Sequence, residues 1–239
     1  MTYSFGPGRL TPAVKALIWA NVAMFVLQAI GGARLTILLG LTPAAVVEQW
    51  WIWQPVTYMF LHGGVGHLLF NMLALWMFGV ELERTWGTIF FTRYYFVTGV
   101  GAAVITVAVA LLPFAFADQM YFIPTVGASG AIYGLLVAYA LYYPDRPIYM
   151  YLLFPVPAKY FVLILGAINF LMSIGNRGGV AYAAHLGGLV VGYLYLTRGR
   201  GGPLADLKYR YLRWRMSRMR RRFGVHHGGR GGGWGGGVH

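Results

Sequence analysis

The sequence predicts an all-α membrane protein, a six-transmembrane-helix bundle with a short fourth helix. Only 10% of the 239 residues are charged and 58% are apolar, whereas a soluble domain carries roughly 25% charged residues. The apolar residues gather in stretches that approach the ~20 residues needed to cross the hydrocarbon core of a bilayer. The chain has no cysteine, which excludes disulfides, thiolate metal sites and cysteine nucleophiles.

Six candidate spans follow one another, at residues 13–30, 67–80, 89–112, 129–143, 159–174 and 181–197. The first has the basic start and apolar middle of a signal peptide, but its cleavage pattern is weak and further spans follow, so we expect a retained helix. The fourth is short and comes after a long apolar loop at 113–126, which predicts a helix that begins below the membrane surface. A break rich in proline separates it from the fifth span.

The placement of positive charge predicts the orientation. Of the 19 Lys and Arg residues, 11 follow Thr197. Positively charged segments stay on the cytoplasmic side, and an even number of spans returns the chain to its starting side, so we expect both termini in the cytoplasm. We expect three parts: an N-terminal cytoplasmic segment (1–12), a six-helix membrane domain (13–197) and a basic, Gly-rich cytoplasmic tail (198–239).

The net charge of +13 suits a nucleic-acid partner, but its distribution favours a membrane surface. Most of the basic tail residues lie within 208–222, and apolar residues recur opposite them at helical spacing: Leu204, Leu207, Tyr211 and Trp214. A basic amphipathic helix beside a span is typical of contact with anionic lipid. We therefore predict anionic membrane lipid, and no nucleic acid, as the partner of the tail.

Ser129 and His185 are the candidate catalytic residues. Ionisable or reactive groups within membrane spans are costly and indicate function, and here a serine opens the fourth span while a histidine lies in the sixth. In the predicted orientation both open to the extracytoplasmic side. A serine attacks a peptide only when a base takes its proton. Because no carboxylate lies beside His185 in the spans, we expect a Ser-His dyad, with Tyr133, one turn after Ser129, stacking on the imidazole.

Small residues surround both candidates. Gly188 and Gly192 follow His185 at i+3 and i+7, and Gly130 and Gly134 follow Ser129, with Gly127 just before it. Glycines at this spacing let helices approach at backbone distance. Either set alone is explained by ordinary span packing, but their positions beside a serine and a histidine favour close contact of the fourth and sixth spans.

His67 and Asn71 lie at i and i+4, on one face of the second span. Both can donate hydrogen bonds to an oxyanion, together with the backbone N–H of Ser129. The alternatives stay open, since a membrane asparagine often joins helices and His62 can serve as a loop cap. A zinc site built from His62, His67 and His185 is disfavoured, because the first two are five residues apart and no His-Glu-x-x-His motif is present. We predict neither a metal nor a cofactor.

Taken in order on six spans, these motifs resemble the rhomboid family of intramembrane serine proteases: His62-x4-His67-x3-Asn71, Gly127-Ala128-Ser129-Gly130 with Tyr133, and Ala184-His185 with Gly188 and Gly192. The resemblance covers about residues 53–196. It implies a rhomboid-like bundle in which the serine heads the short fourth helix, the sixth-helix histidine is the base, and His67 and Asn71 bind the oxyanion. Glu83 resembles the family's structural glutamate at the cytoplasmic end of helix 2.

One position departs from the family pattern. Trp53-Gln54 stands where the family commonly has Trp-Arg, with Thr57 retained. The anchoring of the first loop is therefore open. Three tryptophans in the stretch 49–53, Trp53 among them, offer an aromatic belt as a structural anchor.

The resemblance also implies the substrates, which are transmembrane segments with helix-destabilising residues, cut near the extracytoplasmic face after entry beside helices 2 and 5. A helix must lose its backbone hydrogen bonds before a carbonyl is open to attack. The alternative function is a non-catalytic membrane chaperone or adaptor that binds client helices. The minimal six-span form predicts a bacterial inner membrane protein, and the sequence leaves the physiological substrate and the oligomeric state open.

Overall fold

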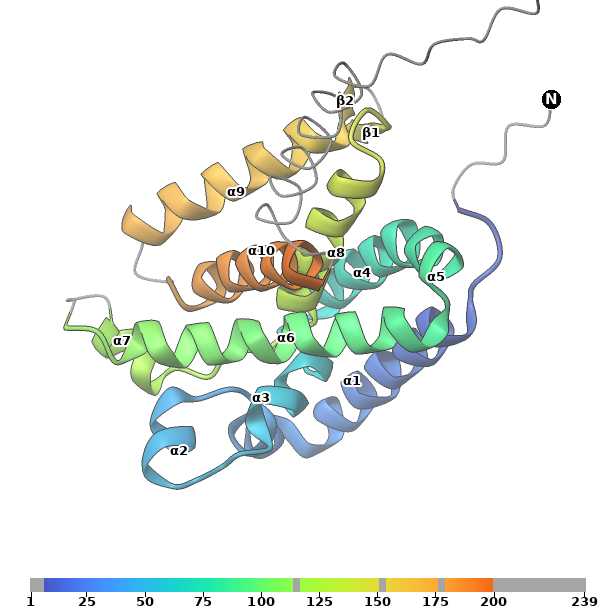
Figure 1. The fold of residues 1–239 in the computed structure, drawn as a ribbon. Helices are drawn as coiled ribbons and strands as arrows, with labels where there is room; N and C mark the ends of the chain where they lie inside the picture. Colours follow the sequence, from blue (N-terminus) through green and yellow to red (C-terminus); the bar gives the residue numbers. More distant parts are fainter. Residues whose placement is uncertain (1–6, 114–116, 151–153, 176–178, 200–239) are drawn as a thin grey trace, which may run out of the picture. The chain divides into compact units, whose positions relative to one another are not determined.

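The computed structural model describes residues 7–113, 117–150, 154–175 and 179–199. Each predicted span falls on a helix (Figure 1): α1 (Pro12–Leu39), α4 (Val65–Ala74) continued by a π-helical turn (Leu75–Gly79) and α5 (Val80–Trp86), α6 (Thr88–Ala110), α8 (Ser129–Tyr142), α9 (Ala158–Gly175) and α10 (Gly179–Gly199). The basic tail from residue 200 onward, and with it the predicted lipid-binding helix, lies outside the described residues.

Within the described part of the chain, three helical stretches are long and apolar enough to cross a membrane, namely Pro12–Leu39, Val65–Trp86 and Thr88–Ala110. Shorter apolar helices cover Ser129–Tyr142 and Ala158–Met172. The prediction of a bundle of apolar helices is confirmed, and the number of six crossings stays a prediction.

The start of α1 is fixed by a carboxylate from another helix. Thr11 and Pro12 open the helix, since proline suits the first turn, where its missing N–H has no acceptor. The free N–H groups of the first turn are bound by the carboxylate of Glu83. The amides of Ala13 and Val14 donate to its two oxygens at 2.9 and 3.0 Å. The hydroxyls of Thr11 and Thr88 also donate to this carboxylate. Glu83 thereby ties α5 to the beginnings of α1 and α6.

The first loop contains two short helices, α2 (Pro43–Glu48) and α3 (Gln54–Thr57), and a 3-10 turn (Tyr58–Phe60). Gln54 is fully buried and anchors this loop to the end of α1. Its amide donates to the Ile37 carbonyl at 3.1 Å, and its oxygen accepts from the Thr42 N–H at 2.9 Å.

Two retained neighbours of Gln54 reinforce this anchor. Thr57 Oγ1 donates to the Leu39 carbonyl at 2.6 Å, and Trp53 Nε1 donates to the Leu38 carbonyl at 2.9 Å. Hydrogen bonds from Gln54, Thr57 and Trp53 therefore anchor the loop to the end of α1. Gln54 stands where the family commonly has an arginine.

The helix α8 lies in the middle of the bundle (Figure 1). It contacts α4, α5, α6 and α9, and nine of its fourteen residues are buried. Buried tyrosines of other segments hold it and its neighbour α6: Tyr94 donates to the Gly134 carbonyl and Tyr58 to the Gly99 carbonyl, both at 2.8 Å. Ser129, the first residue of α8, is therefore carried by a rigid, enclosed element.

The apolar segment at 113–126, expected as a loop, holds a short helix, α7 (Ala117–Phe122). Near its end Thr125 pairs with Leu41 through two backbone hydrogen bonds of 2.8 and 2.9 Å. The expectation of a loop without helix was wrong, and the pairing with Leu41 shows how the first loop and the approach to α8 are joined.

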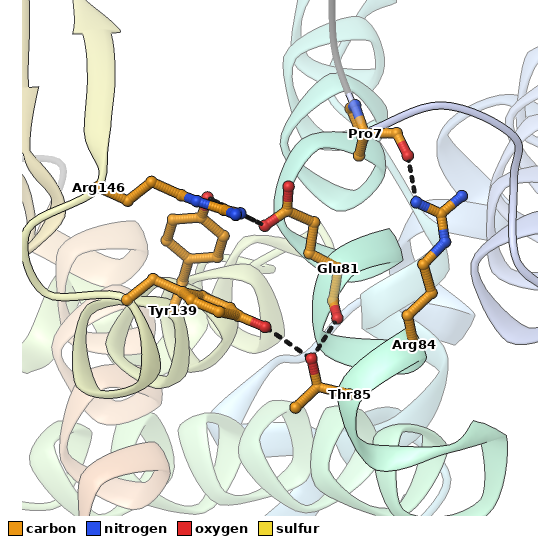
Figure 2. Close-up of polar contacts among 7 residues, drawn as sticks. Pro7, Glu81, Arg84, Thr85, Tyr139 and Arg146 are labelled. Carbon is orange, nitrogen blue, oxygen red and sulfur yellow. Dashed lines mark hydrogen bonds and ion pairs between the residues drawn. The ribbon is translucent and has the colours of Figure 1, made fainter. Parts of the chain in front are cut away.

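Between α8 and α9 the chain forms an antiparallel hairpin of β1 (Pro147–Met150) and β2 (Phe154–Pro157). A polar network lies beside it (Figure 2). Arg146 forms an ion pair with Glu81 of α5, and the hydroxyls of Tyr143 and Thr85 lie 2.6 Å apart. Arg84 donates to the Pro7 carbonyl in the same region. The contacts of Glu81 and Thr85 join α5 to the end of α8 opposite Ser129, and the bond of Arg84 joins α5 to the segment before α1.

The chain divides into a compact unit up to Leu196 and a second unit, Thr197–His239. The helix α10 runs across this boundary, and the side-chain contacts described above lie in the first unit.

Candidate active site

Ser129 and His185 lie within hydrogen-bond distance although 56 residues separate them in the sequence. Ser129 Oγ is 2.8 Å from His185 Nε2. The serine is the first residue of α8 and the histidine lies in α10. This is the geometry in which an imidazole can take the proton of an attacking hydroxyl.

Close packing of α8 against α10 makes this distance possible. A Cβ atom on Gly188 would lie 1.9 Å from the Gly130 carbonyl oxygen, and one on Gly192 would lie 3.0 Å from Gly134 Cα. No side chain fits at either place, so the two backbones meet directly. The structure thus brings Gly130 and Gly134 of one predicted set against Gly188 and Gly192 of the other, whereas the prediction of Gly127 as a packing glycine was wrong, because it lies against His67.

Tyr133 lies against the imidazole, one turn along α8 from the serine. The two rings are stacked, with centroids 4.2 Å apart and planes inclined by 8°. Stacking on one face restricts rotation of the His185 ring about its side-chain bonds.

Asn169 of α9 was not among the residues expected from the sequence. Its side chain is 5% exposed, and its Oδ1 lies 2.8 Å from His185 Nδ1. Its Nδ2 lies 2.8 Å from both the Tyr133 hydroxyl and the Leu165 carbonyl oxygen. The available signal was a single asparagine inside the apolar fifth span, which is costly to bury unless it has partners.

His67 faces Ser129 across Gly127. A Cβ atom on Gly127 would lie 2.9 Å from His67 Nε2 and 3.5 Å from Ser129 Oγ. The Gly63 N–H donates to His67 Nδ1 at 3.3 Å. In the neutral ring the proton is then on Nε2, an atom on the side of the ring that faces Gly127. His67 is therefore placed to donate a hydrogen bond into the space between its ring and Ser129 Oγ.

Gly127 keeps this space free. It has a φ of +130°, a conformation that residues with a Cβ rarely adopt, and its N–H donates to the Tyr58 carbonyl at 2.9 Å. Two residues later Ser129 begins α8, so the Ser129 N–H has no acceptor within the helix. Ser129, which carries this free backbone donor, and the His67 ring both lie beside Gly127.

Asn71 is buried on α4, and its amide donates to the carbonyl of His67 at 2.8 Å. Its Oδ1 has no partner among the described residues. In this arrangement Asn71 bonds to the backbone of the turn that carries His67, and its second amide hydrogen remains available.

His62 is buried beside His67, with ring centroids 5.1 Å apart. Burial and the neighbouring His67 lower the pKa of His62 to about 4, so its ring is neutral near pH 7. Both ring nitrogens lack a partner within the described part of the chain, whereas the backbone N–H of His62 donates to Gln28 Oε1 at 3.0 Å. Across the described ranges no three His, Asp or Glu side chains are grouped as metal ligands would be.

Comparisons with known proteins agree on one family. A family model described as the Rhomboid domain matches residues 48–200. Rhomboid protease AarA of Providencia stuartii is 31% identical over 209 residues, which cover 80% of this chain and 73% of that protein.

Two further relatives are longer than this chain. Rhomboid protease GluP of Bacillus subtilis is 30% identical over 172 residues, which cover 71% of this chain and 31% of that protein. Rhomboid protein 1, mitochondrial, of Saccharomyces cerevisiae is 33% identical over 138 residues, which cover 57% of this chain and 38% of that protein. The chain therefore spans about a third of the length of each of these two. From the extent of the domain match and the likeness to AarA, this multi-pass membrane chain belongs to the rhomboid family.

Proposed function

We propose that the chain is an intramembrane serine endopeptidase that cleaves transmembrane segments near the extracytoplasmic face. The observation that carries the proposal is the 2.8 Å contact between Ser129 Oγ and His185 Nε2 on two apolar helices. Two of the relatives bear the name rhomboid protease, which supports the same reaction.

In the proposed reaction, His185 Nε2 takes the hydroxyl proton while Ser129 Oγ attacks a peptide carbonyl carbon. The resulting tetrahedral intermediate collapses, the C–N bond breaks, and the imidazolium returns the proton to the leaving amine. A water molecule then attacks the acyl-serine, again with His185 as base, and Ser129 Oγ leaves with the proton. Acylation and deacylation each begin and end with a neutral imidazole.

The negative oxygen of the intermediate needs donors that are in place before the reaction. We assign this role to the backbone N–H of Ser129 and to His67 Nε2, which flank the space beside Gly127. Asn71 supports the same turn of α4 and can offer its second amide hydrogen. Removal of one such donor typically lowers kcat about 10²- to 10³-fold.

The proposed substrates are membrane proteins whose transmembrane segments contain helix-destabilising residues such as glycine or proline. A regular helix in lipid uses all its carbonyls in internal hydrogen bonds. A local break exposes a carbonyl to Ser129, so such residues favour cleavage.

The proposed setting is the inner membrane of a bacterium, with both termini in the cytoplasm. The site of Ser129 and His185 then opens to the extracytoplasmic side. The membrane domain is assigned to residues 13–197, between a short N-terminal segment (1–12) and a basic tail (198–239). The charge of the tail supports contact with anionic lipid.

The first test is labelling of the purified protein by a fluorophosphonate, which reacts with activated serines. We expect the wild type to be labelled, and the second-order rate constant to fall about 10³-fold or more in Ser129→Ala and His185→Ala, because neither variant has an activated hydroxyl. Ser173→Ala removes a serine of α9 and serves as the matched control, with labelling at the wild-type rate.

Folded wild-type protein that stays unlabelled in detergent and in liposomes would contradict the proposal and favour a client-binding membrane protein. Labelling that persists in Ser129→Ala would show that another residue is the nucleophile.

A further inference from the structure

Asn169 is the polar residue of α9 that touches the imidazole. Each of its side-chain contacts is 2.8 Å long: Oδ1 to His185 Nδ1, and Nδ2 to the Tyr133 hydroxyl and to the Leu165 carbonyl oxygen. An amide in an apolar environment is stable only when its polar atoms are paired. Here every polar atom of the side chain has a partner, and two of the three partners belong to the site.

The Leu165 carbonyl fixes which way the amide points. A carbonyl oxygen can only accept, so the side-chain atom 2.8 Å from it must be the NH₂ group. The other atom, which faces His185 Nδ1, is therefore the amide oxygen, and it can only accept as well. The proton of the neutral imidazole must then lie on Nδ1.

This tautomer is the one that a general base requires. With the proton on Nδ1, the lone pair of His185 is on Nε2, which faces the Ser129 hydroxyl at 2.8 Å. The opposite tautomer would present an N–H to the serine and could not take its proton. Asn169 also holds the Tyr133 hydroxyl, and Tyr133 stacks on the same imidazole.

We propose that Asn169 is a positioning residue, which selects the tautomer of His185 and fixes its ring from α9. Asn169, His185 and Ser129 then form a continuous series of hydrogen bonds. This proposal rests on the proposed function. Because an amide is uncharged, it orients the ring without the stabilisation of the imidazolium that a buried carboxylate would add.

The proposal also makes the site depend on the position of α9. Ser129 is on α8 and His185 on α10, and the third member of the chain comes from a helix whose outer face carries exposed apolar residues such as Leu163, Ile168 and Leu171. When α9 lies against the site, Asn169 holds the His185 ring with its proton on Nδ1 and its lone pair toward Ser129. When α9 moves away, the His185 ring loses both the acceptor on Nδ1 and the tie on Tyr133.

The test uses full-length protein with ¹⁵N-labelled histidine. The His185 ring signals are assigned by their loss in His185→Ala, and the fluorophosphonate labelling rate is measured on the same samples. In the wild type we expect the tautomer protonated on Nδ1. In Asn169→Leu, which keeps the size of the side chain, we expect a mixture of tautomers and a labelling rate at least about tenfold lower.

Two variants separate positioning from a structural role. Asn169→Asp keeps an acceptor for Nδ1, and we expect it to restore the Nδ1-protonated ring and most of the labelling rate. Asn21→Leu removes another buried asparagine that donates to the carbonyl four residues earlier, Leu17, at 2.7 Å. It lies on α1, away from the site, and we expect an unchanged rate and an unchanged His185 signal.

A wild-type ring protonated on Nε2 would overturn the proposal, and this measurement does not depend on any Asn169 variant folding. A folded Asn169→Leu with the wild-type tautomer and rate would also overturn it. Wild-type protein that is not labelled at all would instead contradict the proposed function.

Discussion

Gly127 lies between His67 and Ser129 in a backbone conformation, φ +130°, that residues with a Cβ rarely adopt. In the proposed reaction, the oxyanion forms in the space that a side chain at this position would fill. The absence of a side chain therefore suits the backbone conformation and, in the proposed reaction, leaves room for the oxyanion.

Gly127→Ala is expected to lower the fluorophosphonate labelling rate about 10²-fold, because the added methyl lies 2.9 Å from His67 Nε2 and displaces one oxyanion donor. The strained backbone adds a loss of roughly 1–2 kcal/mol in the free energy of unfolding. Both effects are measured on purified protein, by labelling kinetics and by unfolding in mixed micelles.

The matched control is Gly66→Ala, since a Cβ at that position meets nothing within 4 Å. It should label at the wild-type rate. A Gly127→Ala protein that folds and labels as fast as Gly66→Ala would show that this space is not used in the reaction.

Among single residues, Ser129, His185 and Tyr133 could be predicted because each is a conspicuous side chain at a helical spacing within an apolar span. Asn169 was missed, since nothing in its local sequence tells which neighbour it bonds. Its role depends on the packing of α8, α9 and α10 about one imidazole, and this is a property of tertiary structure.

At the scale of elements, two glutamates of α5 have different roles. Glu83 is 3% exposed and accepts hydrogen bonds from the first turn of α1 and from Thr88 at the start of α6. Glu81 pairs with Arg146 at the surface, with side chains 26% and 47% exposed. The first joins three helices at their ends, and the second is a solvent-screened ion pair.

Glu83→Gln should lower the free energy of unfolding by about 1.5–3 kcal/mol, because one of two acceptor oxygens and the charge are lost while the N–H groups of α1 stay buried. Glu81→Gln, the matched control, should lower it by less than about 1 kcal/mol. Unfolding in mixed micelles measures both variants, and equal losses would contradict the assignment of Glu83 as the helix-end acceptor.

The long apolar helices could be predicted from the sequence because hydropathy over about 20 residues decides them. The short elements could not. The helix α7 has six residues and gives too little periodicity to be recognised. The β1–β2 hairpin depends on pairing between Pro147–Met150 and Phe154–Pro157, in a stretch whose prolines predict only a break.

In the proposed topology of the whole molecule, the first loop and the α8–α9 hairpin lie on opposite sides of the membrane. The absence of cysteine allows single cysteines to report this. Gln49→Cys, at an exposed position of the first loop, should react with an impermeant maleimide in intact cells. Asp145→Cys, whose side chain is 79% exposed, should react only after the cells are permeabilised.

The reverse pattern of labelling would invert the predicted orientation and place the Ser129 site on the cytoplasmic side. Labelling of both positions in intact cells would contradict a sealed bundle.

The most direct test of the central claim is cleavage of a single-span membrane protein reconstituted with this chain in liposomes. The substrate carries a Gly-Pro pair near the extracytoplasmic end of its span, with a leucine version as the control, and the products are mapped by mass spectrometry. We predict one cut near that end, at least about tenfold slower cleavage of the leucine version, and no product from Ser129→Ala or His185→Ala. An intact substrate beside labelled wild-type protein, or a product that persists in Ser129→Ala, would contradict intramembrane proteolysis by this dyad.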